Sequence, residues 1–263
     1  MQFPNIDPNA FIIFGLEIKW YGVSYAVGLL ISLFYSKFLC KKYKLLDENI
    51  IDDLFIWSAI GIIVGGRLGY VFFYVKDFPN YIEIIFNIRQ GGMSFHGGLI
   101  GVIVANFLLS KKKQINFLAI MDIIACCAPM GIFLGRIANF INSELWGKTT
   151  TLPWGVVFPN GGDLPRHPSQ IYEAILEGLI LFLIINYVYR KNSLPNGLTS
   201  CYFLIFYGFF RIFVEFYREP DIQLGYIVGD KISMGILLSI PMIVLGVILR
   251  FKLDVGFRKN NKK

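Results

Sequence analysis

The sequence contains few charged residues: only 16% of its 263 residues are Asp, Glu, Lys or Arg. An average soluble domain carries roughly 25%. In contrast, 55% of the residues are hydrophobic, and several apolar runs approach the ~20 residues that a helix needs to cross a bilayer. This composition excludes an ordinary soluble protein and predicts an all-α integral membrane protein.

The sequence also lacks internal repeats, low-complexity linkers and any sign of a second domain, so residues 1–263 are predicted to form a single polytopic domain. Seven apolar runs are predicted to be transmembrane helices. They cover residues 18–40, 54–75, 93–110, 117–141, 171–189, 198–214 and 232–251.

The basic residues are distributed unevenly between the predicted loops. With the N-terminus outside, 15 of the 25 lysines and arginines fall in the inner loops and the C-terminal tail, and seven fall in outer segments. The positive-inside rule therefore predicts an outer N-terminus and a cytoplasmic C-terminus. The net charge of +7 is thus attributed to topology and not to nucleic-acid binding. No removable signal peptide is expected at the N-terminus.

Several catalytic signatures are missing. The four cysteines lie in apolar runs without metal-ligand or secreted-disulfide spacing, so they are interpreted as small buried hydrophobes. No serine-nucleophile elbow, zinc cluster or phosphate-binding loop is present. We therefore expect no metal and no cofactor. These absences favour direct transfer between two bound substrates over a covalent enzyme intermediate.

The most informative stretch is Gly135–Asn142, because it places Arg136 inside a membrane-length apolar run. An arginine at a helix centre costs roughly 2.5–3.5 kcal/mol on insertion scales, so it usually faces a cavity and a partner. Asn139 and Asn142 follow at three-residue steps, which puts the polar groups on one helix face. A phosphate or carboxylate suits the five donors of a guanidinium.

Two further runs carry arginines. Arg67 is flanked by glycines, which suits either a functional pocket or close helix packing with a structural partner for the arginine. In the sixth run, Tyr207, Arg211, Glu215 and Arg218 form one polar stripe. An Arg211–Glu215 salt bridge explains part of this stripe, but it does not explain its length.

Other polar residues mark the outer ends of the runs. Tyr21 is either an interface anchor or an inward-pointing hydroxyl. His96 lies among four glycines, which favours a bend at a helix mouth with free N–H groups. Glu173 and Glu177 share one helix face, and two like charges there require a proton or an arginine partner. The outer loop at about residues 144–168 is predicted to be a folded lid.

The topology brings these residues to one depth, near the outer surface of the membrane. We expect a polar cavity with more positive than negative charge. Its lining includes Tyr21, Arg67, His96, Arg136, Asn139, Asn142, Glu144, Glu173, Tyr207, Arg211, Glu215 and Arg218.

Such a cavity suits a lipid with an anionic headgroup, and its arginines can stabilise charge on a departing phosphate. Spacing alone indicates an anionic lipid, the outer leaflet and group transfer. A transporter for an anionic solute is the main alternative, although paired halves and midplane polar groups are lacking. A non-catalytic lipid-binding scaffold is the third.

Six segments, distributed in order along the chain, resemble the prolipoprotein diacylglyceryl transferase family, with Ala138 where that family usually has glycine. The segments are Trp20-Tyr21-Gly22, Gly65–Tyr70, Gly91–Leu99, Gly135–Gly147, Arg166–Glu173 and Arg211–Pro220.

The resemblance implies that the diacylglyceryl group of phosphatidylglycerol passes to the lipobox cysteine thiol of an exported preprolipoprotein, which forms a thioether and releases glycerol-1-phosphate. This is the first step of bacterial lipoprotein maturation, in the inner (cytoplasmic) membrane, with the site facing the outer leaflet. It also implies that Arg136 and Arg211 clamp the phosphate.

The resemblance further suggests His96 as the leading general base for the thiol, with Glu144 or Glu215 as a rival or an orienting partner. Tyr21, Asn139 and Tyr207 are expected to fix the headgroup. Nearby arginines could also stabilise the thiolate and reduce the need for a base.

Overall fold

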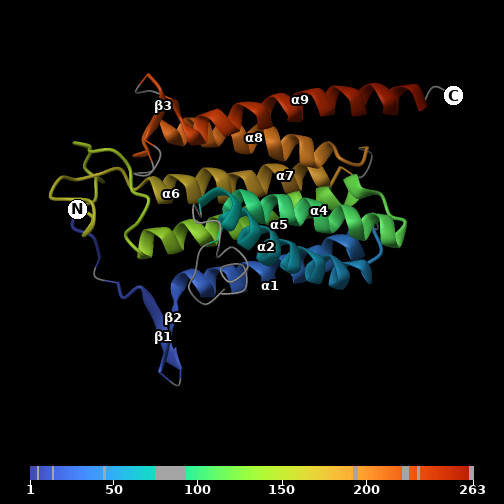
Figure 1. Ribbon diagram of the computed structural model, residues 1–263. Helices are drawn as coiled ribbons and strands as arrows, with labels where there is room; N and C mark the ends of the chain where they lie inside the picture. The colour runs from blue at the N-terminus through green and yellow to red at the C-terminus, as the bar shows by residue number, and fades with distance from the viewer. Residues whose placement is uncertain are drawn as a thin grey trace. The chain divides into compact units, whose positions relative to one another are not determined.

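The computed structural model is predominantly helical (Figure 1). The chain divides into two compact units: residues 1–36 with 122–263 form unit 1, and residues 37–121 form unit 2. The structure describes residues 1–4, 6–13, 15–43, 46–74, 93–191, 195–220, 225–229 and 232–260. Val75 and the pair Gly91-Gly92, which belong to a predicted span and a predicted motif, lie outside the described residues.

All seven predicted apolar segments contain helix. The helical elements are α1 (Trp20–Tyr43), α2 (Ile50–Tyr74), α4 (Phe95–Lys113), α5 (Phe117–Ile141), α6 (Ser169–Glu173), the π-helix η3 (Ala174–Ile180), α7 (Leu181–Tyr189), α8 (Leu198–Glu215) and α9 (Met234–Asn260).

Among the described residues, six helices are long and apolar enough to cross a membrane. They correspond to α1, α2, α5, the α6–η3–α7 segment, α8 and α9. α4 is a 19-residue helix that ends in Lys111-Lys112-Lys113, so less of its length is apolar. The fold is therefore that of an all-α membrane protein with six candidate spans.

Two short hairpins were not predicted from the sequence. β1 (Asn9–Ile13) pairs antiparallel with β2 (Leu16–Lys19), and Gly15 at the turn has a φ of 79°. β3 (Tyr226–Val228) pairs with β4 (Ile232–Ser233) just before α9. Strands of two to five residues are too short to leave a clear alternating pattern in the sequence.

In unit 2, the glycines of α2 and α4 allow the two helices to touch through their backbones. A Cβ atom on Gly65 would collide with the carbonyl of Gly97, and one on Gly61 would collide with that of Gly101. This is the packing that small residues permit between membrane helices.

In unit 1, α8 lies beside both α7 and α9 (Figure 1). The buried carboxylate of Asp122 on α5 accepts hydrogen bonds from the backbone N–H groups of Gly197 (2.6 Å) and Ser200 (2.7 Å), and so caps α8. Tyr35 on α1 donates to Asn186 on α7, whose amide in turn donates to the carbonyl of Cys126 on α5. These bonds fasten the helices to one another.

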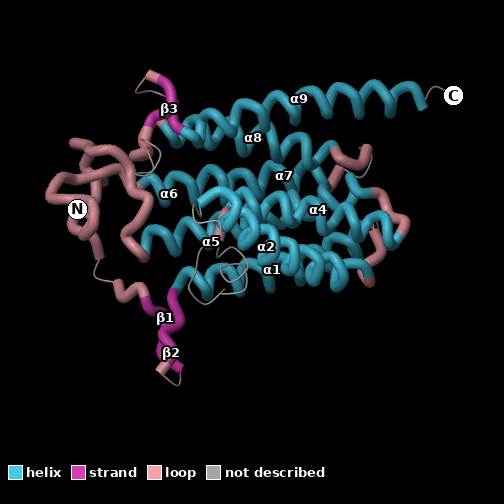
Figure 2. The backbone as a smooth tube through the Cα atoms, viewed as in Figure 1, coloured by secondary structure: helices cyan, strands magenta, loops and turns pink. Residues whose placement is uncertain are grey.

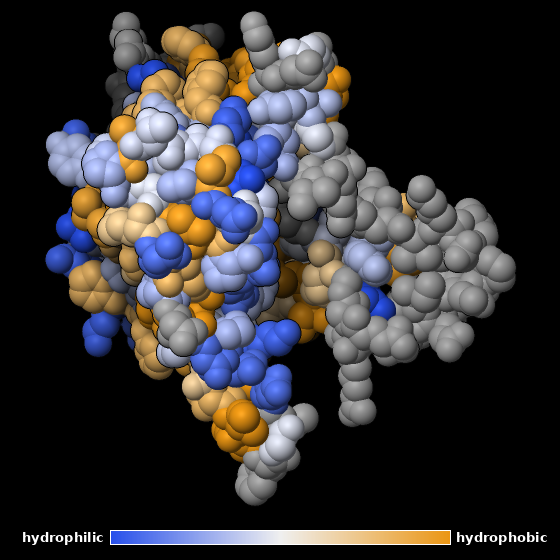
Figure 3. All heavy atoms as spheres, turned by 90° about the vertical axis from the view of Figure 1, so that its left-hand side faces the viewer, coloured by the Kyte–Doolittle hydropathy of each residue, from blue (hydrophilic) through white to orange (hydrophobic). Residues whose placement is uncertain are grey.

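The loop between α5 and α6 is folded, as predicted from the sequence. Its backbone pairs internally, since Thr149 and Val156 both form bridges with Arg166, and Gly147 pairs with Arg218 beyond α8. Figure 2 shows this loop as the irregular segment that gathers around the N-terminus. Figure 3 views unit 1 from that end, where hydrophilic and apolar side chains are mixed on the surface.

All four cysteines are buried and free. This agrees with their interpretation as small hydrophobic side chains.

Candidate functional site

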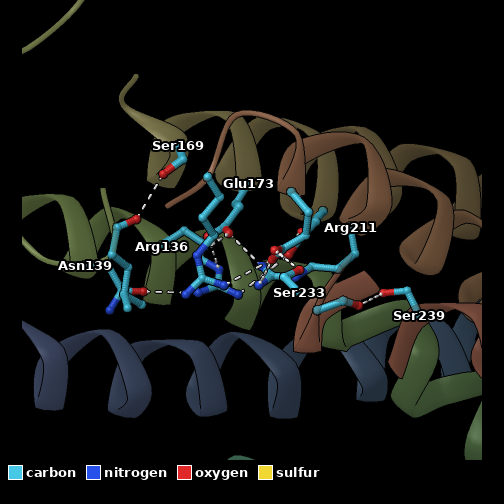
Figure 4. Close-up of polar contacts among 12 residues, drawn as sticks. Arg136, Asn139, Ser169, Glu173, Arg211, Ser233 and Ser239 are labelled. Atoms are coloured by element: carbon cyan, nitrogen blue, oxygen red, sulfur yellow. Dashed lines mark hydrogen bonds and ion pairs between the residues drawn. The ribbon is translucent and has the colours of Figure 1, made fainter. Parts of the chain in front are cut away.

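Arg136 points from α5 toward a carboxylate on the next helical segment. Its Nε lies 2.9 Å from Oε2 of Glu173, and its Nη1 donates to Oδ1 of Asn139 at 3.4 Å (Figure 4). The side chain is 20% exposed. The predicted shared face of Arg136 and Asn139 is thus confirmed, because residues three apart on a helix are neighbours.

Arg211 reaches the same carboxylate from α8. Its Nη1 donates to Oε1 of Glu173 at 2.6 Å, while its Nη2 lies 2.5 Å from Oε1 of Glu215, one helical turn further on. The side chain is 10% exposed, and Glu173 is completely buried. Glu173 therefore bridges the two arginines, with one oxygen on each guanidinium (Figure 4).

Three more residues complete this group. Glu177, also fully buried, lies 3.7 Å from Nη2 of Arg136 and 3.6 Å from Nη1 of Arg211. Arg218 contacts Glu215 at 3.3 Å. We call the following six residues the arginine–glutamate cluster: Arg136, Arg211, Arg218, Glu173, Glu177 and Glu215.

The cluster contains three guanidinium and three carboxylate groups. The expected excess of positive charge therefore does not hold within it. Charges buried at membrane depth are tolerated only when they are paired, and each arginine has at least one glutamate within 4 Å. The sequence did not reveal this charge balance, because it does not say which acids from different helices meet which arginines.

Two glycines make the cluster possible. A Cβ atom on Gly178 in η3 would lie 2.7 Å from Cβ of Phe133, so only glycine lets η3 approach α5 this closely. A side chain on Gly235 at the start of α9 would strike the carboxylate of Glu215, which also accepts a hydrogen bond from Ser233 at 2.5 Å. The π-helix itself is of a kind that is frequent at functional sites.

Glu144 lies next to the cluster in a strained turn. Its Oε1 accepts from Nδ2 of Asn139 at 2.8 Å and from Nδ2 of Asn142 at 3.3 Å, and the residue is exposed. Ser143 and Leu145 on either side have φ values of 54° and 56°. Non-glycine residues adopt this conformation rarely, and it concentrates at functional sites.

The first residues of α6 hold this turn in place. Ser169 donates to the carbonyl of Leu145 at 2.9 Å, and Gln170 donates to the carbonyl of Glu144 at 2.5 Å. The helix starts at Ser169 after Pro168, two residues before the start of the predicted run 171–189. The segment that carries Glu173 therefore also fixes the position of Glu144.

The two tyrosines predicted to be at the site are close to it. Tyr21 on α1 interacts electrostatically with Glu144 and Arg136, and its hydroxyl is 3.2 Å from that of Tyr25. Tyr207 on α8 interacts electrostatically with Glu177 and with both Arg136 and Arg211. The position of Tyr21 was left open from the sequence, and both phenol groups lie within electrostatic range of the cluster.

The loop at residues 144–168 is stabilised by Arg166 and a group of aromatic residues. The Arg166 guanidinium lies 4.1 Å from the centre of the Trp146 ring and donates to the carbonyls of Gly161 and Gly147. Such cation–π stacking favours a defined loop conformation.

His167, at the end of the loop, contacts Tyr172. Its Nδ1 is 3.1 Å from the Tyr172 hydroxyl, which accepts a hydrogen bond from Nε1 of Trp154 at 2.8 Å. Partial burial, and secondarily the positive charge of Lys148, lower the pKa of His167 below its ordinary value. The ring is therefore neutral at physiological pH.

Arg67 and His96 belong to unit 2. Arg67 is buried, and its guanidinium lies 5.6 Å from the centre of the Tyr70 ring. His96 is exposed in the first turn of α4. Ser94 has an extended conformation, and its hydroxyl caps α4 by accepting from the N–H of Gly97; the predicted bend includes Gly91 and Gly92, which lie outside the described residues.

In unit 1, the structure thus brings together Tyr21, Arg136, Asn139, Asn142, Glu144, Glu173, Tyr207, Arg211, Glu215 and Arg218.

Sequence reasoning missed Ser233, which comes from a distant strand and left no signal. It singled out Glu177 by its i+4 spacing from Glu173 and expected an arginine partner, which the structure shows, but it did not include Glu177 among the site residues. Among the described residues, no group of three or more His, Cys, Asp or Glu side chains could hold a metal ion.

Comparison with known proteins gives a consistent result. Residues 8–252 match the family described as "Prolipoprotein diacylglyceryl transferase". The chain is 50% identical over 251 residues to a "Phosphatidylglycerol--prolipoprotein diacylglyceryl transferase" of Rickettsia akari, covering 94% of this chain and 96% of the relative. Proteins with the same description from Rickettsia typhi and Mesorhizobium japonicum are 50% and 48% identical, covering 97% and 94% of this chain and 99% and 90% of the relatives.

Proposed function

The chain belongs to the prolipoprotein diacylglyceryl transferase family, and on that premise we propose that the arginine–glutamate cluster binds the headgroup of phosphatidylglycerol. It is a transferase that passes the diacylglyceryl group of phosphatidylglycerol to a prolipoprotein, the first step of lipoprotein maturation. The expected class of reaction is therefore confirmed, while the roles of individual residues are proposals.

The acceptor in this proposal is the thiol of the lipobox cysteine. Its sulfur attacks the glyceryl carbon that carries the phosphate ester, a carbon–sulfur bond forms and the carbon–oxygen bond breaks. The electron pair of the broken bond goes to the phosphate oxygen, and glycerol-1-phosphate leaves with one more negative charge. The thiol proton goes to a base or to solvent, and no covalent enzyme intermediate is needed.

One observation carries the assignment of the phosphate site: Arg136 and Arg211, from two different helices, converge on a single buried carboxylate. Two guanidinium groups that share the two oxygens of Glu173 are spaced to share the oxygens of a phosphate as well. They would stabilise the charge that develops on the leaving group. Arg136 is the more accessible of the two, at 20% exposed against 10%.

The polar residues around Arg136 and Arg211 are assigned to headgroup binding. Tyr21 and Tyr207 supply phenol hydroxyls, and Asn139 and Asn142 supply amide groups at the same turn. Arg218 would support Glu215, which it contacts at 3.3 Å. Arg67 remains a proposed binding residue from unit 2.

For the base, the structure favours Glu144 over Glu215. Glu215 is buried and already accepts from Arg211 and Ser233, so it is poorly placed to take a further proton. Glu144 is exposed on a strained turn. His96, also exposed, remains the leading candidate. A His96→Gln variant should lose the acidic limb of the pH–activity profile, where a general base is protonated and inactive, and an unchanged profile would transfer the role to Glu144.

We further propose seven transmembrane spans, with α4 as the seventh, in the bacterial inner membrane. The N-terminus would be outside, the C-terminus in the cytoplasm and the cluster open to the outer leaflet, with the loop at residues 144–168 above it as a lid. The charge distribution of the loops supports this orientation. Cysteine labelling of Thr151→Cys and Lys252→Cys variants from outside the cell tests it. The first should react and the second should not.

The experiment for the activity itself uses purified protein, phosphatidylglycerol vesicles and a peptide with a lipobox cysteine. A peptide mass increase equal to one diacylglyceryl group supports the proposal. Lipid turnover without that product, or lipid flux across proteoliposomes without any product, would contradict it.

A further inference from the structure

The six charges of the arginine–glutamate cluster balance before any substrate is present, and one of its carboxylates is held much less firmly than the others. Glu173 bonds to Arg136 and Arg211 at 2.9 and 2.6 Å. Glu215 bonds to Arg211 and Ser233, both at 2.5 Å. Each of these carboxylates thus accepts one short hydrogen bond, Glu173 from Arg211 and Glu215 from Ser233, and each has a further ion-pair contact of 2.9 Å or less with a guanidinium group.

Glu177 is different. Its side chain is completely buried, yet neither of its oxygens has a hydrogen-bond partner among the residues that the structure describes. Its nearest cationic nitrogens are 3.6 and 3.7 Å away, which is beyond hydrogen-bond distance. Its negative charge therefore depends on the electrostatic field of the arginines alone.

Among the described residues, charged and titratable groups from several elements face Glu177. They are Arg136 on α5, Glu173 on α6, Tyr207 and Arg211 on α8, and Arg218 just beyond α8. Two arginines lie within 4 Å of Glu177 and stabilise its negative charge, whereas the negatively charged Glu173 destabilises it.

An entering phosphodiester changes this balance. It adds one negative charge to a group with no net charge, and it competes for the guanidinium that is most accessible, that of Arg136. The contact that it can displace most easily is the 3.7 Å contact with Glu177, since the Arg136–Glu173 bond is short. A buried carboxylate that loses its cationic partner is costly as an anion, and a proton removes that cost.

We propose that Glu177 takes up one proton when the anionic lipid headgroup enters the cluster. The cluster then returns to zero net charge: three guanidinium groups balance two carboxylates and one phosphodiester. This inference rests on the proposed phosphate site. It makes Glu177 a positioning residue that allows three arginines to be buried without the lipid and to bind an anion with it.

Calorimetry measures the proton directly. A short-chain phosphatidylglycerol is titrated into the full-length protein in pairs of buffers that differ in ionisation enthalpy, from about pH 6 to about pH 9, the range in which buried carboxyl groups can titrate. Wild type should take up about one proton per lipid at the alkaline end, and its affinity should fall about tenfold per pH unit there. No uptake at any pH would overturn the proposal.

The isosteric Glu177→Gln variant should bind the lipid without proton uptake and with an affinity that does not depend on pH. Glu219→Gln is the matched control, because Glu219 is also paired to an arginine, Arg166 at 3.2 Å, but lies outside the cluster. It should behave as wild type does. Proton uptake that persists in Glu177→Gln would overturn the proposal.

Two further measurements separate the possible failures. If Glu177→Gln does not fold, infrared difference spectra of wild type should still show a protonated carboxyl band that appears with phosphatidylglycerol and not with zwitterionic phosphatidylcholine. The absence of that band would contradict the proposal. Thioether formation is assayed in parallel: its absence in wild type refutes the proposed function, whereas normal product without proton uptake refutes only the role of Glu177.

Discussion

Replacing Arg136 by lysine tests whether the shape of the guanidinium matters or only its charge. Arg136 uses three different nitrogens in three directions: Nε to Glu173 at 2.9 Å, Nη1 to Asn139 at 3.4 Å, and Nη2 toward Glu177 at 3.7 Å. A lysine keeps the positive charge but presents one ammonium group on a flexible stem. It cannot hold Glu173 and a phosphate in the same geometry.

The size of the effect follows from the bonds that are lost. A hydrogen bond to a charged group contributes about 1.5–3 kcal/mol. Because each 1.36 kcal/mol corresponds to a factor of ten in rate, losing one such bond in the transition state lowers kcat/KM roughly 10- to 160-fold. Most of the loss should be in kcat if the bond strengthens as charge builds on the leaving phosphate.

The assay is thioether formation on a lipobox peptide with phosphatidylglycerol vesicles, followed by mass spectrometry. Arg250→Lys is the control, because that guanidinium lies over Tyr202 at 5.3 Å and outside the cluster. Its activity should stay near wild type. If Arg136→Lys folds normally and turns over within threefold of wild type, only the charge of Arg136 matters and the shape of its guanidinium does not.

Three other changes have defined outcomes. Gly178→Ala forces a methyl group against Phe133, so the free energy of unfolding should fall by about 1–3 kcal/mol and activity should fall with it; unchanged stability in a denaturant titration would show that η3 can move away from α5. Asp122→Asn weakens the cap of α8 at Gly197 and should lower the free energy of unfolding by about 0.5–2 kcal/mol, with little change in kcat for the properly folded fraction. Because the pKa of His167 is lowered in the folded state, the unfolded chain binds the extra proton first, and wild type should lose stability relative to His167→Gln as the pH falls from about 7 to about 5; parallel stability curves for the two proteins would contradict this.

The sequence was a good guide to the helices because membrane helices are long and their apolar runs are hard to mistake. The predicted run 117–141 coincides with α5, and 198–214 differs from α8 by one residue. The polar faces were also predictable where they lie within one helix. Arg136 with Asn139, and Arg211 with Glu215, follow from the three- and four-residue steps of a helix.

The contacts between helices could not be read in the same way. That Glu173 would bridge Arg136 and Arg211, or that Ser233 would reach Glu215, depends on how far each helix is shifted and rotated against its neighbour. The π-helix that carries Glu177 also left no signal, because a helix inserts an extra residue in a turn in response to packing more than to local sequence. The charge balance of the cluster was missed for these reasons.

The central claim is that Arg136 and Arg211 hold the lipid phosphate together. The most direct measurement is an experimental structure of the protein in lipid with phosphatidylglycerol bound. The claim predicts phosphate oxygens about 2.7–2.9 Å from nitrogens of both guanidinium groups, as in other charge-assisted hydrogen bonds. A phosphate bound elsewhere, with both arginines still joined to Glu173 as they are without lipid, would contradict it.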